Sequence, residues 1–415
     1  MFWSEDKNMD DLVDAVKSRI SYQDIDFNPN ELADLSGFIR DLETILLDKA
    51  KLVDTKAQVF FRRYIKSIKI IPAFQKFGFS QYYLYFRPFY YKSQSYEIDF
   101  KLLFINSFQK IKYPACIESN LPLFIEYIFP FRKPNKSYLN WLVKSKKSVS
   151  EYCLFYKKKF YDIIHFNRNL TKEGWKYSSI RFKSYMDDVL FNPTYNPELS
   201  EIREFDLSEI SDSSIYGPDT QEFKDLTQIY NTHSLDIKSH LGTKNYSIIN
   251  AITHLLEKKL IFPYPSLKNL DFQEKISIIL PEIKQGLNEK IINIFSFFNL
   301  CRIYEIEGEF FIYGFNQEKS FENGLLIELW FPKCELDEFF NIFDLLFQYL
   351  EIKHYLILTD LVKGKTLLKS VYENIDFLKE YNPLLNLKWN EKDKIWMNHK
   401  LFTEKMKKIY PDLIP

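Results

Sequence analysis

The chain has 415 residues, of which 46% are hydrophobic and 18% aromatic, so it is long enough for two to four domains with packed cores. Its 10 glycines form no phosphate-binding loop and its four cysteines contain no CxxC pair, which argues against a P-loop enzyme, a zinc ribbon and a disulfide scaffold. The formal net charge of zero conceals a strongly basic segment, because residues 55–165 hold 20 Lys/Arg and 6 Asp/Glu, a local field that favours phosphate.

The first 78 residues read as helices. Residues 1–30 are expected to form an acidic N-terminal helix, and residues 31–78 a first helix-turn-helix, in which one helix runs from Leu32 to Leu47. Thr55 is a suitable N-cap for the next helix, and Val59, Ile65 and Ile68 then share a face at helical spacing.

The period changes to that of strands from Ser80, and residues 79–165 are expected to form a first ferredoxin-like domain. The predicted strands cover 81–89, 113–118, 121–129 and 152–164, and the predicted helices cover 95–111 and 135–150. This is the β-α-β-β-α-β order of a ferredoxin-like sandwich.

Residues 166–220 read as an acidic linker with two Asn-Pro pairs, after which the pattern restarts. Residues 221–272 predict a second, winged helix-turn-helix, with helices at 221–230 and 235–241, a third helix capped by Thr243, and a strand at 261–267. Residues 273–370 predict a second ferredoxin-like domain, with strands at 275–280, 302–315, 324–331 and 353–360 and helices at 287–300 and 335–350. Residues 371–415 form a C-terminal tail.

A sequence motif occurs once in each half. Ile125–Pro130 reads Ile-Glu-Tyr-Ile-Phe-Pro, and Ile327–Pro332 reads Ile-Glu-Leu-Trp-Phe-Pro. Each copy follows a β-type segment and precedes an amphipathic helix, which indicates a long internal repeat. We therefore expect an α+β fold of two tandem units, each a winged helix-turn-helix followed by a ferredoxin-like βαββαβ sandwich.

The helix-turn-helix predicts DNA binding, because the second helix of such a unit lies in the major groove and Arg can reach guanine edges or phosphates. The candidate DNA-binding residues are Lys56, Gln58, Arg62, Arg63 and Lys66 in the first unit and Lys244, Asn245, Tyr246, Ser247 and Asn250 in the second. The second set is less basic, so the second unit binds DNA weakly or has lost that role. A basic helix of a small helical domain without any DNA role is the alternative interpretation.

Together these features resemble the Lrp/AsnC family of archaeal and bacterial transcription regulators. The segment from Leu241 to Ile261 is similar to the recognition helix and exit strand of that family, and the segment from Leu52 to Pro72 is a looser match. The resemblance implies a cytoplasmic transcription regulator with double-stranded DNA as its partner. A small-molecule effector and self-association through the ferredoxin-like sheets remain open as further partners. Two units in one chain would pair as a pseudo-dimer, and the glycine-rich loops that shape an effector pocket are not evident.

Two further patterns leave alternatives open. Lysines at 144, 146, 147 and 157–159 could extend a DNA-contacting face or could be the solvated surface of a helix and an edge strand. The aromatic run Tyr82, Tyr83, Tyr85 and Phe86 could stack on bases or pack in the sheet core.

Motifs for enzyme chemistry are weak in this sequence. The six histidines are scattered, and no G-x-S-x-G, Walker or HExxH motif occurs, so we expect no enzyme, no metal and no cofactor. The acidic N-terminus has no apolar core and no apolar run is long enough to span a membrane, so no membrane partner is expected. Two alternatives stand beside the regulator: a non-enzymatic protein-interaction scaffold, and an Lrp-like enzyme of the sirohaem decarboxylase type, whose domain plan is similar.

Overall fold

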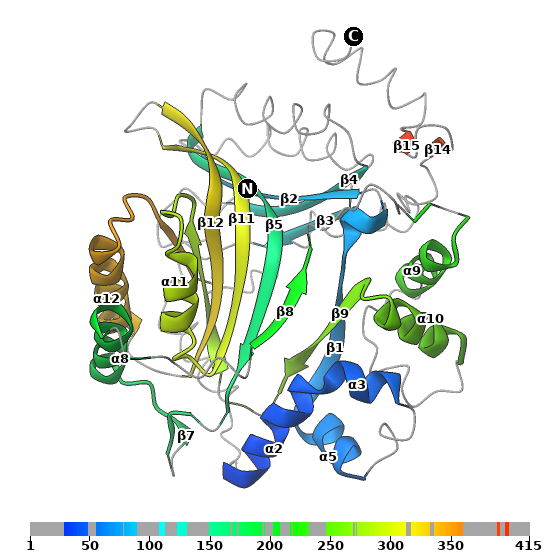
Figure 1. Ribbon diagram of the computed structural model, residues 1–415, viewed down its shortest axis with the longest axis horizontal. Coiled ribbons are helices and arrows are strands. Elements are labelled where there is room, and N and C mark those ends of the chain that lie inside the picture. The colour runs from blue at the N-terminus through cyan, green and yellow to red at the C-terminus, as the bar shows by residue number, and fades with distance from the viewer. Residues whose placement is uncertain are drawn as a thin grey trace, which may run out of the picture.

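A long antiparallel sheet occupies the centre of the molecule, with helices on one side and two helical heads on the other (Figure 1). The computed structural model describes residues 29–48, 55–77, 79–88, 108–112, 123–130, 149–166, 168–171, 174–192, 195, 202–207, 216–217, 219–231, 246–268, 270, 272–312, 317–332, 336–359, 388–390 and 395–397. The helices are α2 (Pro29–Arg40), α3 (Leu42–Leu47), α5 (Thr55–Arg63), the 3-10 helix η1 (Phe74–Phe77), α8 (Ser179–Phe191), α9 (Gln221–Asn231), α10 (Tyr246–Glu257), α11 (Asn288–Phe295) and α12 (Leu336–Tyr349). The strands are β1 (Ile65–Pro72), β2 (Phe79–Pro88), β3 (Phe108–Lys112), β4 (Leu123–Pro130), β5 (Val149–Ile164), β6 (Leu170–Thr171), β7 (Gly174–Trp175), β8 (Ile202–Asp206), β9 (Ile261–Leu267), β10 (Phe272–Leu280), β11 (Leu300–Ile312), β12 (Gln317–Pro332), β13 (Leu356–Thr359), β14 (Lys388–Asn390) and β15 (Ile395–Met397).

The strands of the central sheet lie in the order β13-β10-β12-β11-β5-β2-β4-β3. One half of this row is β13-β10-β12-β11 and the other half is β5-β2-β4-β3. Both halves have the same internal order: the last strand of the half in chain order comes first, followed by its first, third and second strands. The two copies of the sequence motif occupy the third strand of each half, and Pro130 lies opposite Phe79 as Pro332 lies opposite Phe272. The architecture is mixed α+β with antiparallel sheets.

Strand β5 joins the two halves of the sheet. It pairs with β11 along its length on one side, and on the other side with β2 in its first part and β8 in its second part. The register of β5 against β11 shifts at Lys158, because Lys157 lies opposite Ile306 and Lys159 opposite Glu305. Such an extra residue is a β-bulge, which increases the local twist of the long strand.

The helices α8, α11 and α12 pack on one face of the sheet (Figure 1). Helix α8 begins after Ser178, whose side chain accepts a hydrogen bond from the Arg181 amide at 3.3 Å, and Phe182 and Met186 form its fully buried face. Residues 166–220 were expected to be a weakly ordered acidic linker. That expectation is wrong for α8, which lies in the core, and for β8, which extends the sheet.

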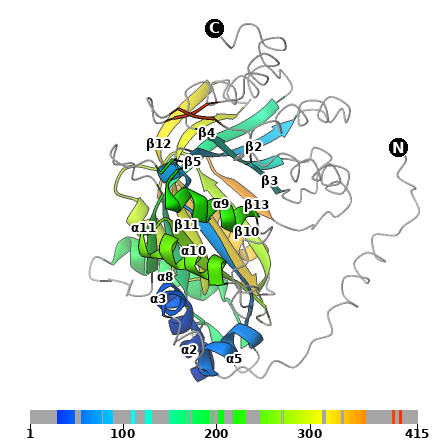
Figure 2. The same ribbon diagram turned by 90° about the vertical axis from the view of Figure 1, so that its right-hand side faces the viewer.

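Two helical heads lie on the other side, joined by a two-stranded ribbon. The first head consists of α2, α3 and α5 and leads into β1, and the second consists of α9 and α10 and leads into β9. Strands β1 and β9 pair antiparallel, with Ile65 opposite Leu267 and Pro72 opposite Ile261. Figure 2 shows α9 and α10 above α2, α3 and α5 along this ribbon. One hydrophobic core contains side chains of both heads, so the heads form a single packed layer.

Several predicted boundaries differ from the structure. The helix that was expected to continue through Ile68 ends at Arg63, because Ile65, Ile68 and Ile70 face the core as alternating residues of a strand whose partner is far away in sequence. The prediction of a helix at 95–111 is wrong at its C-terminal end, because Phe108–Lys112 forms strand β3. The helix predicted at 287–300 ends earlier, at Phe295.

The strand predicted at 261–267 and the helices predicted at 221–230 and 335–350 are confirmed to within a residue or two. The expectations for residues 1–28, 113–118, 135–148, 235–241 and most of the tail lie outside the described residues. Within the described part of the chain, no helix has the length and apolar character needed to cross a membrane.

Candidate functional site

The predicted DNA-binding residues of the first head fall on two different elements. Arg62 is exposed on α5, whereas Arg63 donates from Nη1 to both carboxylate oxygens of Glu31 at 3.0 Å. Lys66 is exposed but lies on strand β1, so its placement on a recognition helix is wrong. The side chains of Lys56 and Gln58 lie outside the described part of α5.

In the second head, several polar side chains of α10 contact α9. The Ser247 hydroxyl accepts a hydrogen bond from Gln228 Nε2 at 2.9 Å, and His254 Nδ1 lies 2.6 Å from Asp225. Lys258, directly after α10, pairs with Glu222. Asn250 is exposed. Of the remaining predicted residues, Lys244 and Asn245 lie outside the described residues, and only the backbone of Tyr246 is described. These contacts tie α10 to its neighbouring helix.

The lysines at 157–159 lie at the centre of the sheet, so their interpretation as a solvated edge strand is wrong. Lys157 is buried, with Nζ 4.0 Å from the ring centre of Tyr83 and 3.5 Å from that of Tyr304. Lys158 pairs with Glu307 at 2.6 Å and Lys159 pairs with Glu204 at 2.5 Å. Tyr83 and Tyr85 are themselves buried, which confirms core packing for these two residues of the aromatic run, whereas Tyr82 is half-buried.

A buried ion cluster lies where β5, β8 and β11 meet. The carboxylate of Asp162 is completely buried, and it accepts hydrogen bonds from Arg203 and, at 3.0 Å, from Nε of Arg302. Burial alone would raise the pKa of Asp162, but the two guanidinium groups outweigh it and hold that pKa below its usual value. Burial opposes the charged form of Arg302 as well, yet the adjacent Asp162 raises the pKa of this guanidinium above its ordinary value. Asp162 is therefore ionised and fully committed to two arginines.

Aromatic rings surround the two arginines of this cluster. The guanidinium carbon of Arg302 lies 4.3 Å from the ring centre of Tyr264 and 4.9 Å from that of Trp330. Arg203 lies 4.5 Å from the ring centre of Phe262 and donates to the carbonyl oxygen of Pro263 at 3.3 Å. Both arginines thus connect the sheet to strand β9 of the ribbon.

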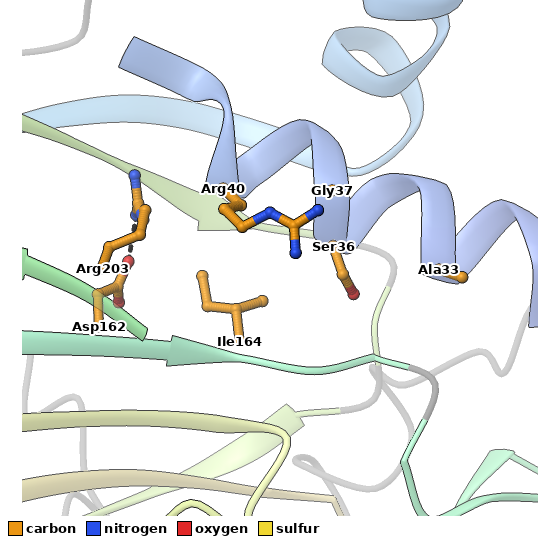
Figure 3. A pocket seen from close by; sticks show the side chains of 7 residues that line it. All are labelled: Ala33, Ser36, Gly37, Arg40, Asp162, Ile164 and Arg203. Carbon is orange, nitrogen blue, oxygen red and sulfur yellow. Dashed lines mark hydrogen bonds and ion pairs between the residues drawn. The ribbon is translucent and has the colours of Figure 1, made fainter. Parts of the chain in front are cut away.

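A cavity of about 80 Å³ opens between α2 and this ion cluster. Its lining residues are Ala33, Ser36, Gly37 and Arg40 from α2, Asp162 and Ile164 from β5, and Arg203 from β8. Figure 3 shows the Arg40 side chain above Ile164 with its guanidinium group directed toward Ser36, and Arg203 and Asp162 on the opposite side of this space.

Positive charge is in excess around the cavity. The Arg40 side chain is about half exposed, and its ion pair with Asp41 is long, with 3.9 Å between Nε and the carboxylate oxygen. Arg203 and Arg302 both bind the carboxylate of Asp162, and the charge of Glu328 also acts on Arg302, so the excess lies in the cavity lining itself, where Arg40 and Arg203 stand against Asp162. Burial raises the pKa of the nearby Glu43, against the opposing charges of Arg203 and Lys259. An anion in the cavity would be attracted by the guanidinium groups in a site that is partly shielded from water.

Sequence reasoning missed Arg40, Asp162 and Arg203, which come from three distant segments and carry no local motif. The described residues contain no group of three His, Cys, Asp or Glu side chains that could hold a metal ion. Of the histidines, His165 is buried at the junction of β5 with the following loop, and burial lowers its pKa to about 3. A neutral, deeply buried His165 contributes to packing.

Comparison with known proteins gives two similar structures. No protein-family model matches the chain, and no curated protein matches it. The crystal structure of the siroheme decarboxylase NirDL is 10% identical, with a TM-score of 0.37 over 84% of this chain and 99% of that chain. The crystal structure of NirDL with an iron-uroporphyrin III analogue is 9% identical, with a TM-score of 0.34 over 75% of this chain and 81% of that chain.

Both structures are those of an enzyme, and this finding overturns the expectation that the chain is not an enzyme. Similarity at this level transfers no residue, ligand or reaction to the present chain.

Proposed function

We propose that the protein binds an anionic small molecule in the cavity between α2 and the sheet, with Arg40 as the anion-binding side chain and Arg203 as a second positive charge in the cavity wall. The observation that carries this proposal is the charge balance: the one carboxylate in the cavity wall is already shared by two arginines, while Arg40 extends over the same space. Arg is the side chain best suited to this role, because its planar group donates in pairs to carboxylate and phosphate oxygens.

We further propose that the chain is built as two tandem units that pair within one molecule. The equivalent positions of the two sequence motifs, the matching strand order of the two halves, and the pairing of β1 with β9 support this arrangement. The cavity lies where the first head meets the centre of the joined sheet, so it depends on segments from both sides of that junction.

An enzyme of the sirohaem decarboxylase type remains a candidate for the reaction. Pockets for whole small molecules usually measure roughly 300–1,000 Å³, so a cavity of about 80 Å³ does not enclose a tetrapyrrole ring. A carboxylate side chain of such a molecule is the part that Arg40 would bind. Uroporphyrin III therefore serves as a probe for binding and for release of CO₂.

The proposal is tested by calorimetric titration with acetate, phosphate, sulfate and uroporphyrin III at low ionic strength. Arg40→Gln should weaken binding of the preferred anion at least about tenfold, since a hydrogen bond to a charged group contributes about 1.5–3 kcal/mol. Arg62→Gln, which removes an exposed arginine outside the cavity, is the matched control and should leave the affinity unchanged. Absence of binding for all four anions, or equal losses in both variants, would contradict the proposal.

DNA binding by the first head is a second candidate. Arg62 and Lys66 are both exposed, and no ion pair is recorded for either of them within the described residues. They could neutralise phosphates, in which case the affinity for random-sequence duplex DNA should fall steeply with salt. The double variant Arg62→Gln/Lys66→Gln should reduce that affinity and its salt dependence, with Arg40→Gln as the control. Equal salt dependence in the double variant and the parent would exclude this head as the binding surface.

A further inference from the structure

We infer that the anion bound in this cavity is a monocarboxylate with a short apolar chain, either as a free acid or as one arm of a larger molecule. The inference rests on the proposed function and names the chemical class of its ligand. It follows from the polar groups that line the cavity, from the charge of Asp162 and from the available volume.

The lining offers guanidinium groups and little else that is polar and uncommitted. The Ser36 hydroxyl donates to the Leu32 carbonyl oxygen at 3.1 Å and accepts from the Phe166 amide at 3.0 Å. The remaining lining from α2 and β5 is small or apolar: Ala33, Gly37 and Ile164. A ligand therefore finds Arg40 for one charged end and an apolar wall for the rest of its length, which suits a hydrocarbon chain better than a second polar group.

Asp162 selects against a second negative charge. Its carboxylate is ionised, completely buried and part of the cavity wall. A dicarboxylate that bound Arg40 at one end would bring its other carboxylate against Ala33 and Ile164 or toward Asp162, where Arg203 already donates to Asp162 and to the Pro263 carbonyl oxygen. Like charges repel more strongly in a partly dry site, and a charge on an apolar wall loses its hydration without compensation. Dicarboxylates should therefore bind much more weakly than monocarboxylates.

The volume limits the chain length. The cavity measures about 80 Å³, several-fold less than the roughly 300–1,000 Å³ of pockets that enclose a whole small molecule. A short acid such as acetate or propionate therefore suits it better than a long one, and a longer chain would have to leave through the exposed rim, where Ala33 lies. Propionate or an equivalent side arm is the expected optimum.

The test is calorimetric titration of the full chain with acetate, propionate, butyrate, malonate and succinate. Propionate should bind at least about tenfold more tightly than malonate or succinate. Gly37→Ala reduces the cavity without changing its charge, and the added Cβ would stand 3.7 Å from Nη2 of Arg40, an ordinary contact. This variant should weaken butyrate and propionate more than acetate, a change in selectivity that general destabilisation would not produce.

The outcomes separate the inference from the proposed function. If malonate and succinate bind as tightly as propionate, the inference is overturned while anion binding stands. If phosphate or sulfate binds and no carboxylate does, the inference is likewise overturned. If no anion binds at all, the proposed function itself fails. Competition between propionate and uroporphyrin III then distinguishes the two sources: mutual displacement assigns the cavity to an arm of a larger molecule, and binding of propionate alone assigns it to a free acid.

Discussion

Replacing Asp162 by alanine should destabilise the fold far more than the loss of any exposed ion pair. The substitution leaves Arg203 and Arg302 without their shared counter-ion at a point where the side chains of both are 9% exposed. Removing one partner of a buried ion pair costs about 3–5 kcal/mol, because the remaining charge stays buried and unpaired.

The environment of the two arginines places the expected loss near the lower end of that range. Arg203 keeps its hydrogen bond to the Pro263 carbonyl oxygen, and Arg302 keeps the rings of Tyr264 and Trp330. We therefore expect a loss of about 3 kcal/mol in the free energy of unfolding. Asp162→Asn, which keeps the shape and one acceptor oxygen but not the charge, should lose less.

The assay is urea unfolding at pH 7 followed by circular dichroism, with the slope m checked so that midpoints can be compared. Glu204→Ala is the matched control, because Glu204 forms an ion pair with Lys159 on the neighbouring part of β5 and both side chains are substantially exposed, at 52% and 32%. Exposed pairs contribute less than about 1 kcal/mol. If Asp162→Ala costs no more than Glu204→Ala, the ion cluster does not hold the sheet, the ribbon and the cavity together as described.

Three further substitutions test the packing. Gly308→Ala should cost about 1–3 kcal/mol in a thermal melt, because its Cβ would stand 2.0 Å from the Leu154 carbonyl oxygen and force β5 and β11 apart; an unchanged melting temperature would contradict that pairing. Phe182→Ala should cost about 3–5 kcal/mol, whereas Phe191→Ala on the same helix, 64% exposed, should cost little; equal losses would show that α8 is not packed on the core. His165 makes the fold sensitive to acid, because its pKa is about 3 in the folded chain against an ordinary 6.5. The contribution of the neutral imidazole to the free energy of unfolding is therefore full above pH 6.5 and falls as the pH decreases, by about 2 kcal/mol at pH 5. His165→Gln should therefore lose less stability than the parent between pH 7 and 5, and parallel losses would refute a neutral buried imidazole.

Local patterns predicted much of the fold, because they reflect the period of each element. The run Phe339, Phe343, Leu346 and Phe347 has helical spacing, and α12 follows it. Ser178 with Phe182 and Met186 carries an equally good helix signal, but its position in an acidic segment with Asn-Pro pairs suggested a linker. The same ambiguity affected Ile65 and Ile68, whose spacing fits a helix until β9 is known to lie beside them.

The candidate site could not be predicted in this way, because it depends on pairing between distant segments. Nothing local to Asp162 indicates that Arg203 and Arg302 approach it, since one comes from β8 and the other from β11. Lys157 illustrates the converse case: a lysine within a basic run suggests a surface, yet the tyrosines of two neighbouring strands enclose it. The excess of Lys and Arg in residues 55–165 predicted a phosphate-bearing partner, but Lys157, Lys158 and Lys159 of this segment contact tyrosines and glutamates inside the fold.

The pairings of β5 have a consequence for the order in which the chain can fold. During synthesis, residues 149–164 emerge well before residues 300–312, so the edge of β5 that β11 covers stays open until more than two thirds of the chain has been made. The ribbon likewise waits for residues 261–267 to reach β1. Contacts of such long range fold slowly, and an open edge can pair with another chain in the meantime. Separately produced halves would therefore be expected to aggregate unless they are refolded together.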